Sequence, residues 1–384
     1  MRKVCIVVNS RANYARIKSV LTAVREHPDL QLQLVVGASA LLERFGRVID
    51  LIRADGFREE AVVYMALEGD TTANMVKSTA LGMIELSSLF MHITPDIVLT
   101  VADRYETLAT AVTASYMNIP LAHTQGGETT GSIDESVRHA ITKLAHIHFP
   151  ATDKARENLI RMGEDPATIY MTGCPALDLV TGMKDRSIDQ TFWARNAGVG
   201  YQNGWSEPYI VVLQHPVTTE NTEANKQIDE TLHAVRALGM RTIWMWPNID
   251  AGSDAISKRL RVFHENQGGE KVTFYKNFSS EDFIRLIDNS VCMIGNSSSA
   301  LREGSLLGVP VVNVGSRQQT REHGANVMHA DYNAVAIEAA ARAQITHGKY
   351  VPDELFGDGT AGRQIADILA TCKISVQKRL HYPN

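Results

Sequence analysis

Three features are scarce in this sequence of 384 residues, and each absence excludes a class of protein. Cysteine occurs only four times and never with CxxC spacing, so a disulfide scaffold is not indicated. No apolar run reaches the roughly 18 residues that a membrane span needs. Basic residues are not in excess: 38 Lys and Arg face 43 Asp and Glu, a net charge of −5, which argues against a nucleic-acid-binding protein. An anionic substrate would therefore have to be held by a few local basic side chains.

The apolar start of the chain is too short for a signal peptide. The run Val4–Val8 breaks at Asn9, so it predicts a buried first strand rather than a secretory segment. We therefore expect a cytoplasmic protein whose cysteines are buried, reduced thiols. These cysteines are Cys5, Cys174, Cys292 and Cys372.

Short β-branched runs alternate with longer amphipathic stretches along most of the chain. This alternation predicts an α/β fold with parallel sheets, and its restart after about residue 208 predicts two α/β halves. The expected strands are 4–8, 32–36, 97–101, 119–123, 209–213, 242–245, 272–275, 292–295 and 311–314. The expected helices are 14–26, 70–92, 105–117, 136–146, 225–238, 254–265, 280–289 and 301–307.

The length predicts about two domains, and composition suggests where they divide. We expect an N-terminal domain over residues 1–181 and a C-terminal domain over 208–358. The stretch between them is rich in Gly and Asn and lacks a strong period, as a linker does. Residues 359–384 are expected to form a C-terminal helical segment, with its helix over 359–376, that packs back on the N-terminal domain.

Polar motifs follow the predicted strands of the first half. Ligands of open α/β sheets bind beyond the carboxyl ends of the strands, so these motifs are candidate site residues. Arg11 follows the first strand, and the pair Asp103 and Arg104 follows the strand over 97–101. Asp103 could instead cap a helix. Asp134 and Arg138 are four residues apart, so they can share a helical face, either as part of an acid–base site or as a simple ion pair.

The second half carries a comparable series of polar motifs after its strands. Ser297 and Ser298 precede a predicted helix, where backbone N–H groups could bind a diphosphate; a plain helix cap is the alternative. Glu303 lies one to two turns further on and could reach ribose hydroxyls. No GxGxxG or GxxxxGK[ST] motif is present, which disfavours a dinucleotide or P-loop site. His139 and His146 share a helical face without a completing ligand, so we expect no metal.

Six separated motifs, in this order along the chain, resemble the UDP-N-acetylglucosamine 2-epimerase family, and most of all its hydrolysing branch. The most specific are His123-Thr-Gln-Gly-Gly-Glu128 and Gly131-Ser-Ile-Asp-Glu-Ser-Val-Arg-His-Ala-Ile-Thr-Lys143. The others are Gly173-Cys-Pro175 with Asp178, Gln214-His-Pro-Val-Thr-Thr219, Pro247-Asn-Ile-Asp-Ala-Gly252 and Gly295-Asn-Ser-Ser298.

The resemblance implies two Rossmann-like domains of the glycosyltransferase-B type, with the nucleotide held mainly by the C-terminal domain across an interdomain cleft. It implies that a UDP-N-acetylhexosamine loses UDP by elimination through a 2-acetamidoglucal, and that hydration then gives a free ManNAc-type sugar. It implies no metal and no NAD, and assembly as a homodimer or homotetramer. The charge and the lack of a long apolar run already predict no nucleic-acid and no membrane partner.

Carried over by position, the resemblance assigns acid–base chemistry to Asp103 and Asp134. Arg138 would position one of them or the leaving diphosphate, and His215 would contact the diphosphate or assist the departure of UDP. Glu128 would supply a further carboxylate. The expected substrate-binding residues are Arg11, Arg104, Ser297, Ser298 and Arg317 at the phosphates, Glu303 at the ribose, Asn248 near the nucleotide or sugar, and Gln125 and Asp178. For Asp178 a structural role is an equal alternative.

The sequence departs from the family pattern at three positions. Asn13 replaces an acidic residue, Ala102 replaces a glycine, and Gln125 stands where a glutamate is frequent. The altered carboxylate set leaves alternatives open. The substrate could be a UDP- or GDP-2,4-diacetamido-2,4,6-trideoxyhexose, as in legionaminic acid pathways, or the enzyme could be non-hydrolysing. A glycosyltransferase and a non-catalytic sugar-nucleotide-binding protein are the hypotheses from other classes.

Overall fold

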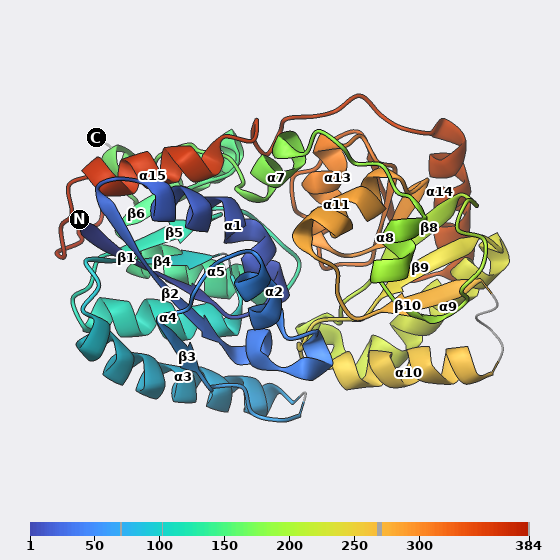
Figure 1. Cartoon of the computed structure of the whole chain (residues 1–384), viewed down its shortest axis with the longest axis horizontal. Coiled ribbons are helices and arrows are strands. Elements are labelled where there is room, and N and C mark those ends of the chain that lie inside the picture. Colours follow the sequence, from blue (N-terminus) through green and yellow to red (C-terminus); the bar gives the residue numbers. More distant parts are fainter. Residues whose placement is uncertain (70, 102, 267–270, 383–384) are drawn as a thin grey trace.

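Two β-sheets organise the molecule, one in each half of the chain (Figure 1). The structure is a computed structural model that describes residues 1–69, 71–101, 103–266 and 271–382. Helices cover both faces of each sheet, and the two halves lie side by side. The predicted α/β class is therefore confirmed. Among the described residues, no helix is both long and apolar enough to cross a bilayer.

The N-terminal sheet has six parallel strands in the order β3-β2-β1-β4-β5-β6. This is the doubly wound order, in which the chain reverses direction across the sheet between β1 and β4. The strands are β1 (Arg2–Val8), β2 (Leu30–Gly37), β3 (Ala61–Val63), β4 (Ile97–Val101), β5 (Leu121–Thr124) and β6 (Ile147–Phe149). The helices of this half are α1 (Arg11–Glu26), α2 (Val48–Ala54), α3 (Thr72–Ile93), α4 (Tyr105–Tyr116), α5 (Ile133–Leu144), α6 (Asp153–Arg161) and α7 (Ala176–Gly182), with short 3-10 turns η1 (Ala38–Leu41), η2 (Glu43–Phe45) and η3 (Pro166–Thr168).

The C-terminal sheet repeats this topology. Its order is β13-β12-β11-β8-β9-β10-β7, so the six parallel strands show the same doubly wound order, with the reversal between β8 and β11. The strands are β7 (Val199–Gly200), β8 (Tyr209–Leu213), β9 (Arg241–Met245), β10 (Val272–Tyr275), β11 (Cys292–Gly295), β12 (Val311–Val314) and β13 (Val327–Ala330). The helices are α8 (Gln190–Arg195), η4 (Thr218–Glu223), α9 (Ala224–Leu238), α10 (Ser253–Glu265), α11 (Ser280–Asp288), α12 (Ser298–Leu301), α13 (Glu303–Leu306), α14 (Ala334–His347) and α15 (Ala361–Thr371).

Each central strand is apolar on both faces because helices bury both sides of the sheet. In β1, Val4, Ile6 and Val8 belong to the core shared with α1 and α15, whereas Cys5 and Val7 belong to the core on the α3 and α4 side. Successive side chains of a strand point to opposite faces, so a run without polar residues is what two covered faces require.

The chain returns to its first half at the C-terminus. After α14 a long segment crosses to the N-terminal half, where α15 lies against α1 (Figure 1). Ile365, Ala366 and Leu369 of α15 are buried in the same core as the α1 side chains. The structured helix is shorter than the range 359–376 that the sequence suggests.

The segment between the two halves contains structure that its weak period did not reveal. Within 182–208, α8 buries Phe192 and Trp193 against the C-terminal sheet, and β7 pairs antiparallel with β10. Two adjacent buried aromatics in a six-residue helix produce no helical period. The strands β3 and β6 were not predicted either, because three residues are too few to show an alternation. The expected helix over 70–92 corresponds to α3, and its first residue, Asp70, lies outside the described residues.

Candidate active site

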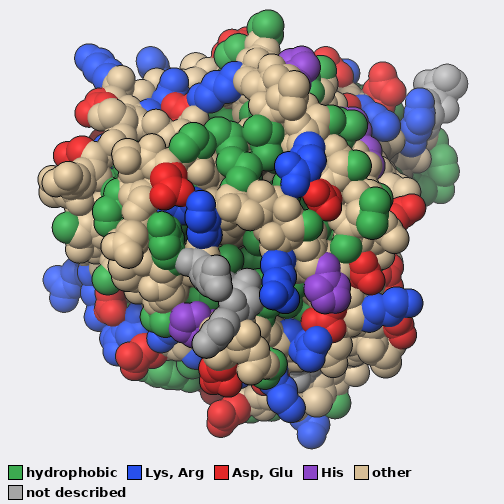
Figure 2. Space-filling model, turned by 90° about the vertical axis from the view of Figure 1, so that its right-hand side faces the viewer, with side chains coloured by type: hydrophobic (Ala, Val, Ile, Leu, Met, Phe, Trp, Pro, Cys, Tyr) green, Lys and Arg blue, Asp and Glu red, His purple; other side chains and the backbone are tan. Residues whose placement is uncertain are grey.

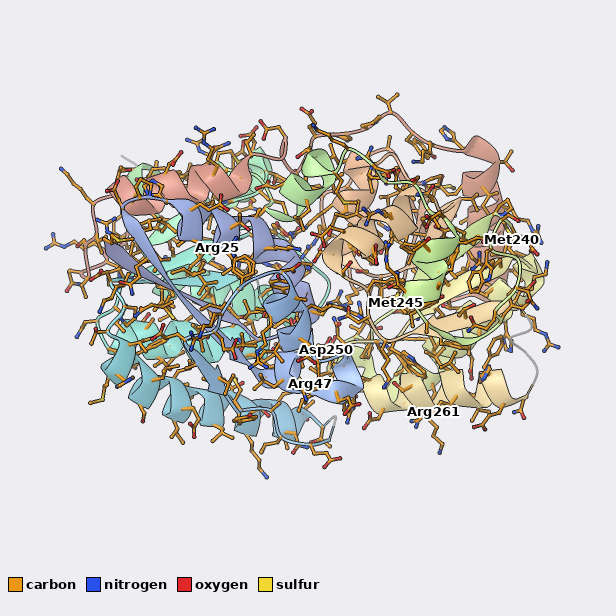
Figure 3. All side chains as sticks on the ribbon, viewed as in Figure 1. Arg25, Arg47, Met240, Met245, Asp250 and Arg261 are labelled. Carbon is orange, nitrogen blue, oxygen red and sulfur yellow. The ribbon has the colours of Figure 1, made fainter. Side chains whose placement is uncertain are left out.

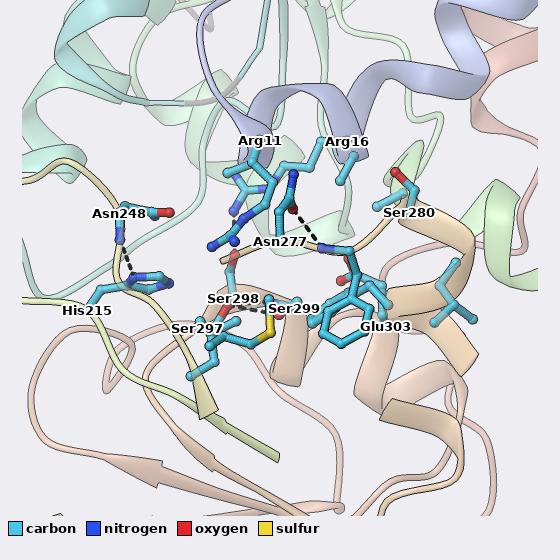
Figure 4. A pocket seen from close by; sticks show the side chains of 18 of the residues that line it. Arg11, Arg16, His215, Asn248, Asn277, Ser280, Ser297, Ser298, Ser299 and Glu303 are labelled. Carbon is cyan, nitrogen blue, oxygen red and sulfur yellow. Dashed lines mark hydrogen bonds between the residues drawn. The ribbon is translucent and has the colours of Figure 1, made fainter. Parts of the chain in front are cut away.

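The predicted site residues converge where the two sheets reverse their winding. Arg11 follows β1 and Asp103 follows β4, while His215 follows β8 and Ser297 follows β11. These are the switch points of the two sheets, where ligands of doubly wound folds bind. All four side chains line one cleft between the halves, which Figure 4 shows from close by. Of the remaining predicted residues, the same cleft is lined by Arg104, Asn248, Ser298, Glu303 and Arg317.

The start of α1 brings two arginines to the cleft. Arg11 and Arg16, at the start of α1, point toward the serines of α12 (Figure 4). Arg11 Nη1 donates to the carbonyl of Lys276 at 2.6 Å, and an Arg16 nitrogen donates to Ser298 Oγ. Neither arginine forms an ion pair with a described carboxylate. Burial lowers the pKa of Arg11 to about 10, so Arg11 still carries its charge at neutral pH. Burial, and then the charge of Arg302, lower the pKa of Arg16. Such a pair of uncompensated guanidinium groups suits a diphosphate.

Arg16 was not among the predicted residues, although a signal existed. It lies in the second turn of the helix that begins with Arg11, at the end that faces the cleft. Arg11 and Arg16 both lie in the first two turns of the helix that follows the buried strand β1, and this shared position is the signal for Arg16.

His215 is held as a neutral hydrogen-bond donor. Its Nδ1 accepts the backbone N–H of Asn248 at 3.2 Å, so a neutral ring carries its proton on Nε2. Burial, and then the charges of Arg317 and Arg11, keep the pKa of His215 well below its usual range. The Asn296 side chain fixes the backbone of this loop: its Oδ1 accepts from His215 N at 2.7 Å and its Nδ2 donates to His215 O at 2.8 Å.

The two aspartates of the site have opposite electrostatic environments. Burial disfavours the charged form of Asp103, but Arg138, Arg16 and Arg321 outweigh burial and hold the pKa of Asp103 below its usual range. Burial and the neighbouring charge of Asp103 raise the pKa of Asp134. Two interacting carboxylates with pKa values pushed apart are the arrangement that divides acid and base roles. Asp134 does not line the cleft itself; its Oδ2 lies 3.5 Å from Arg317 Nη2.

Arg104 lines the cleft, but its charge is already compensated. Its guanidinium forms ion pairs with Glu106 at 3.2 Å and with Asp250 of the other half at 2.8 Å. Asp250 lies between the two halves in Figure 3. The expected phosphate contact of Arg104 would therefore compete with two buried carboxylates, and Arg104 joins the two halves in this structure.

Glu128 lies behind the cleft in a buried cluster of charges. Its carboxylate pairs with Arg302 and lies 3.2 Å from Arg321 Nη1. Arg138 donates to the Glu128 carbonyl at 2.7 Å and pairs with Asp103. Burial opposes the charge of Glu128, but Arg302 and Arg321 outweigh burial and lower its pKa. Glu128 is thus held as a charged carboxylate between the halves, and its expected catalytic role stays a prediction.

Two further predicted residues do not line the cleft. Gln125 is buried at a φ of 61°, and its Nε2 contacts Cys174 Sγ at 3.2 Å. Asp178 caps α15: its carboxylate accepts from Ala361 N at 3.1 Å and from Gly362 N at 2.6 Å. This capping contact joins the C-terminal helix to α7, and the expected substrate contact of Asp178 stays a prediction.

Replacing Asp178 by alanine is expected to destabilise the fold without changing the cleft. Loss of a helix cap costs about 0.5–2 kcal/mol, and the freed N–H groups of α15 are partly buried. Urea unfolding should shift to lower concentration while the affinity for UDP, measured by calorimetry, stays that of the parent. A weakened UDP affinity would instead support the expected substrate contact.

The charge in the cleft does not continue over the outer end of the C-terminal half. Figure 2 shows Lys and Arg interspersed with Asp and Glu on that face. Charges of both signs are therefore mixed on that face, and no patch of a single sign is visible there.

The sequence matches proteins of one family over nearly its whole length. A family model described as UDP-N-acetylglucosamine 2-epimerase matches residues 22–370. A relative from Legionella pneumophila, named UDP-N,N'-diacetylbacillosamine 2-epimerase (hydrolyzing), is 32% identical, with 98% of each chain covered. A UDP-N-acetylglucosamine 2-epimerase from Neisseria meningitidis is 29% identical over 99% of this chain and 98% of the relative.

Solved structures share the fold at low sequence identity. UDP-GlcNAc 2-epimerase from Methanocaldococcus jannaschii, solved in complex with UDP-GlcNAc and UDP, has a TM-score of 0.81 at 16% identity, covering 96% of this chain and 99% of that chain. The Neisseria meningitidis enzyme, bound to UDP-GlcNAc, has a TM-score of 0.76 at 17% identity, with the same coverage. The likeness confirms the expected pair of Rossmann-like domains in a glycosyltransferase-B-like arrangement.

Proposed function

Since the chain belongs to the UDP-N-acetylglucosamine 2-epimerase family, we propose that it is a hydrolysing member, which releases UDP and a free ManNAc-type sugar. The observation that carries this proposal is the pair Asp103 and Asp134, with pKa values pushed apart, beside a cleft lined by uncompensated arginines. The relative that is 32% identical bears a hydrolysing name, which supports the same outcome.

The arginine end of the cleft would bind the diphosphate. Arg11, Arg16 and the serines of α12 face one another there, and Glu303 lies in the same lining, where it can reach the ribose. His215 would donate its Nε2 proton in a hydrogen bond to the bridging oxygen of the leaving diphosphate. Donors placed where negative charge develops lower the barrier without reorganisation during the reaction.

Elimination would then begin at Asp103, the ionised carboxylate that lines the cleft. Its oxygen accepts H-2, the C2–H electron pair forms the C1–C2 double bond, and the C1–O bond breaks with its electrons leaving on UDP. A carboxylate with a low pKa is a weak base, so stabilisation of the departing diphosphate must supply much of the rate.

Hydration would complete the reaction with inversion at C2. Water adds its hydroxyl to C1 of the glucal, and C2 receives a proton on the face opposite to the one that lost H-2. Asp134, whose pKa is raised, is the group we assign to hold that proton. Arg138, paired with Asp103, would keep that carboxylate ionised before it accepts H-2. The proton taken from C2 and the proton lost by the attacking water would then pass to solvent, which returns Asp103 to its ionised form.

Turnover in D₂O is expected to yield UDP and a free sugar that carries deuterium at C2. The proton that leaves C2 exchanges with solvent, and the proton that C2 receives comes from a solvent-equilibrated acid. Each product molecule should therefore carry one deuterium at C2, and its H-2 signal should be absent from the ¹H NMR spectrum. UDP-GlcNAc and a UDP-2,4-diacetamido-2,4,6-trideoxyhexose should be compared, along with the GDP form. Deuterated nucleotide sugar without free UDP would make the enzyme non-hydrolysing.

The sugar is the finer part of the proposal. A relative named for diacetylbacillosamine and the presence of Gln125 at the altered position both favour testing the 4-acetamido-6-deoxy sugar beside UDP-GlcNAc.

We propose residues 1–181 and 208–358 as the two domains, and residues 359–384 as the segment that returns to the first domain. We also propose a cytoplasmic homodimer or homotetramer, which sedimentation velocity can measure.

A further inference from the structure

A loop of the C-terminal domain docks on a loop of the N-terminal domain beside the carboxylates. Residues 315–324, the 315–324 loop, connect β12 to β13. Gly131 N donates to Arg317 O at 3.0 Å, and Thr129 Oγ1 donates to Thr320 O at 2.7 Å. A Cβ on Gly131 would lie 2.0 Å from Ser316 O, so the backbones meet at a distance that only glycine permits.

The 315–324 loop brings two arginines to carboxylates of the other domain. Arg317 Nη2 lies 3.5 Å from Asp134 Oδ2. Arg321 Nη2 lies 3.7 Å from Asp103 Oδ2, and Arg321 Nη1 lies 3.2 Å from Glu128 Oε2. The Arg321 side chain is 3% exposed, so its charge is buried beside these acids and little screened by solvent. One loop therefore contacts both members of the proposed acid–base pair.

The carboxylate of Glu128 opposes the ionisation of Asp103, and further charges face Asp103 from several elements. Arg138 on α5 pairs with it, and the charge of Arg16 on α1 acts on it from the same domain. Asp134, also on α5, opposes them. Arg321 alone among these groups belongs to the C-terminal domain, so it can be beside Asp103 only while the two domains are together.

We propose that Arg321 is a positioning residue: domain closure over the nucleotide places its guanidinium between Asp103 and Glu128 and so completes the charge pattern of the reacting pair. This inference rests on the proposed function. Arg321 and Arg317 lie on one loop of the C-terminal domain. Asp103 and Asp134 of the N-terminal domain therefore have their full set of neighbouring charges only when the two domains are docked. Premature proton abstraction from an unclosed complex is thereby disfavoured.

The sign of the pH effect follows from the charge that is removed. Without Arg321 the carboxylate of Asp103 loses a stabilising cation, so its pKa rises and it becomes protonated at a higher pH. A cation within about 4–6 Å lowers an aspartate pKa by about 1–3 units. For Arg321→Met we expect the acidic limb of the kcat profile to move up by about one pH unit, with KM changed by less than about threefold.

Two matched variants separate charge from structure. Arg321→Lys keeps the positive charge, so its acidic limb should stay within a few tenths of a unit of the parent, even if kcat falls. Glu322→Gln changes the next residue of the same loop, which hydrogen-bonds Thr152 of the other domain and touches neither Asp103 nor Asp134. Its kcat and pH profile should equal those of the parent.

The proposal is wrong if Arg321→Met loses activity while its pH profile stays in place, or if Arg321→Lys and Arg321→Met shift the limb equally. A second test applies if the radius of gyration of the parent, measured by X-ray scattering, decreases when UDP binds. The proposal is also wrong if hydrogen exchange then shows the same protection of residues 129–131 and of the 315–324 loop with and without UDP. Failure of the proposed function is distinguishable, because the parent would then release no UDP from any nucleotide sugar tested.

Discussion

Asp103→Asn is expected to lower kcat by about 10²–10⁴-fold, the usual contribution of a positioned acid or base. The amide has nearly the shape of the carboxylate but cannot accept H-2. Asp103 is also negative and lines the cleft that would hold a diphosphate, so its neutralisation should leave the affinity for UDP unchanged or make it tighter. A large loss of kcat with undiminished UDP binding is therefore the expected combination.

The control for this variant is Asp229→Asn. Asp229 pairs with Arg259 at the surface of the C-terminal domain and does not line the cleft. Its kcat should equal that of the parent. Release of UDP at the parent rate by Asp103→Asn, with an inactive Asp134→Asn, would transfer the role of base to Asp134.

The position of the site could be predicted from the sequence because it depends on strand ends. A short apolar run predicts a buried strand, and the polar residues that follow it must lie at the carboxyl edge of the sheet. This rule predicts that Arg11, Asp103, His215 and Ser297 lie together, and in the structure they line one cleft. The two-domain organisation followed from the restart of the same alternation, and both sheets have the expected parallel strands.

The pairing of charges across the domains could not be predicted in this way. Helical spacing relates Asp134 to Arg138, yet Arg138 pairs with Asp103, and Arg317 is the cation nearest Asp134. No periodicity relates Glu128 to Arg302, which lies 174 residues further on. Such contacts depend on how two separately folded sheets dock, and a local pattern carries no information about that.

Residue type and position in the sequence did not indicate the surroundings of Glu128 and Asp178. Glu128 follows two glycines on a loop, a place where an acid is usually solvated and free to react. In the structure its side chain is 3% exposed and shared by two arginines, so its environment favours a permanent charge. Asp178 follows a family motif but accepts two backbone N–H groups of a helix that lies far along the chain.

Glu128→Gln is expected to lower the free energy of unfolding by about 3–5 kcal/mol, since removing one partner leaves buried charge uncompensated. Arg302 and Arg321, which are 1% and 3% exposed at the side chain, would lose their shared anion. Both arginines belong to the C-terminal domain and Glu128 to the N-terminal one, so kcat/KM should fall along with stability because the closed state is weakened. Urea unfolding and UDP-release kinetics measure the two effects.

The double variant Glu128→Gln/Arg302→Met decides whether Glu128 acts by charge balance or by chemistry. Removing a cation together with the anion restores the balance, and replacing a buried ion pair by apolar groups is often close to neutral for stability. If Glu128 only balances charge, the double variant should recover most of the stability and most of kcat/KM. The double variant should then lose much less free energy of unfolding than the sum of the losses of the two single variants, which is a large coupling energy. If Glu128 transfers a proton, stability should return while kcat stays low, because neither glutamine nor methionine can replace a carboxylate. The two arginines held by Glu128 make recovery of both quantities the expected result.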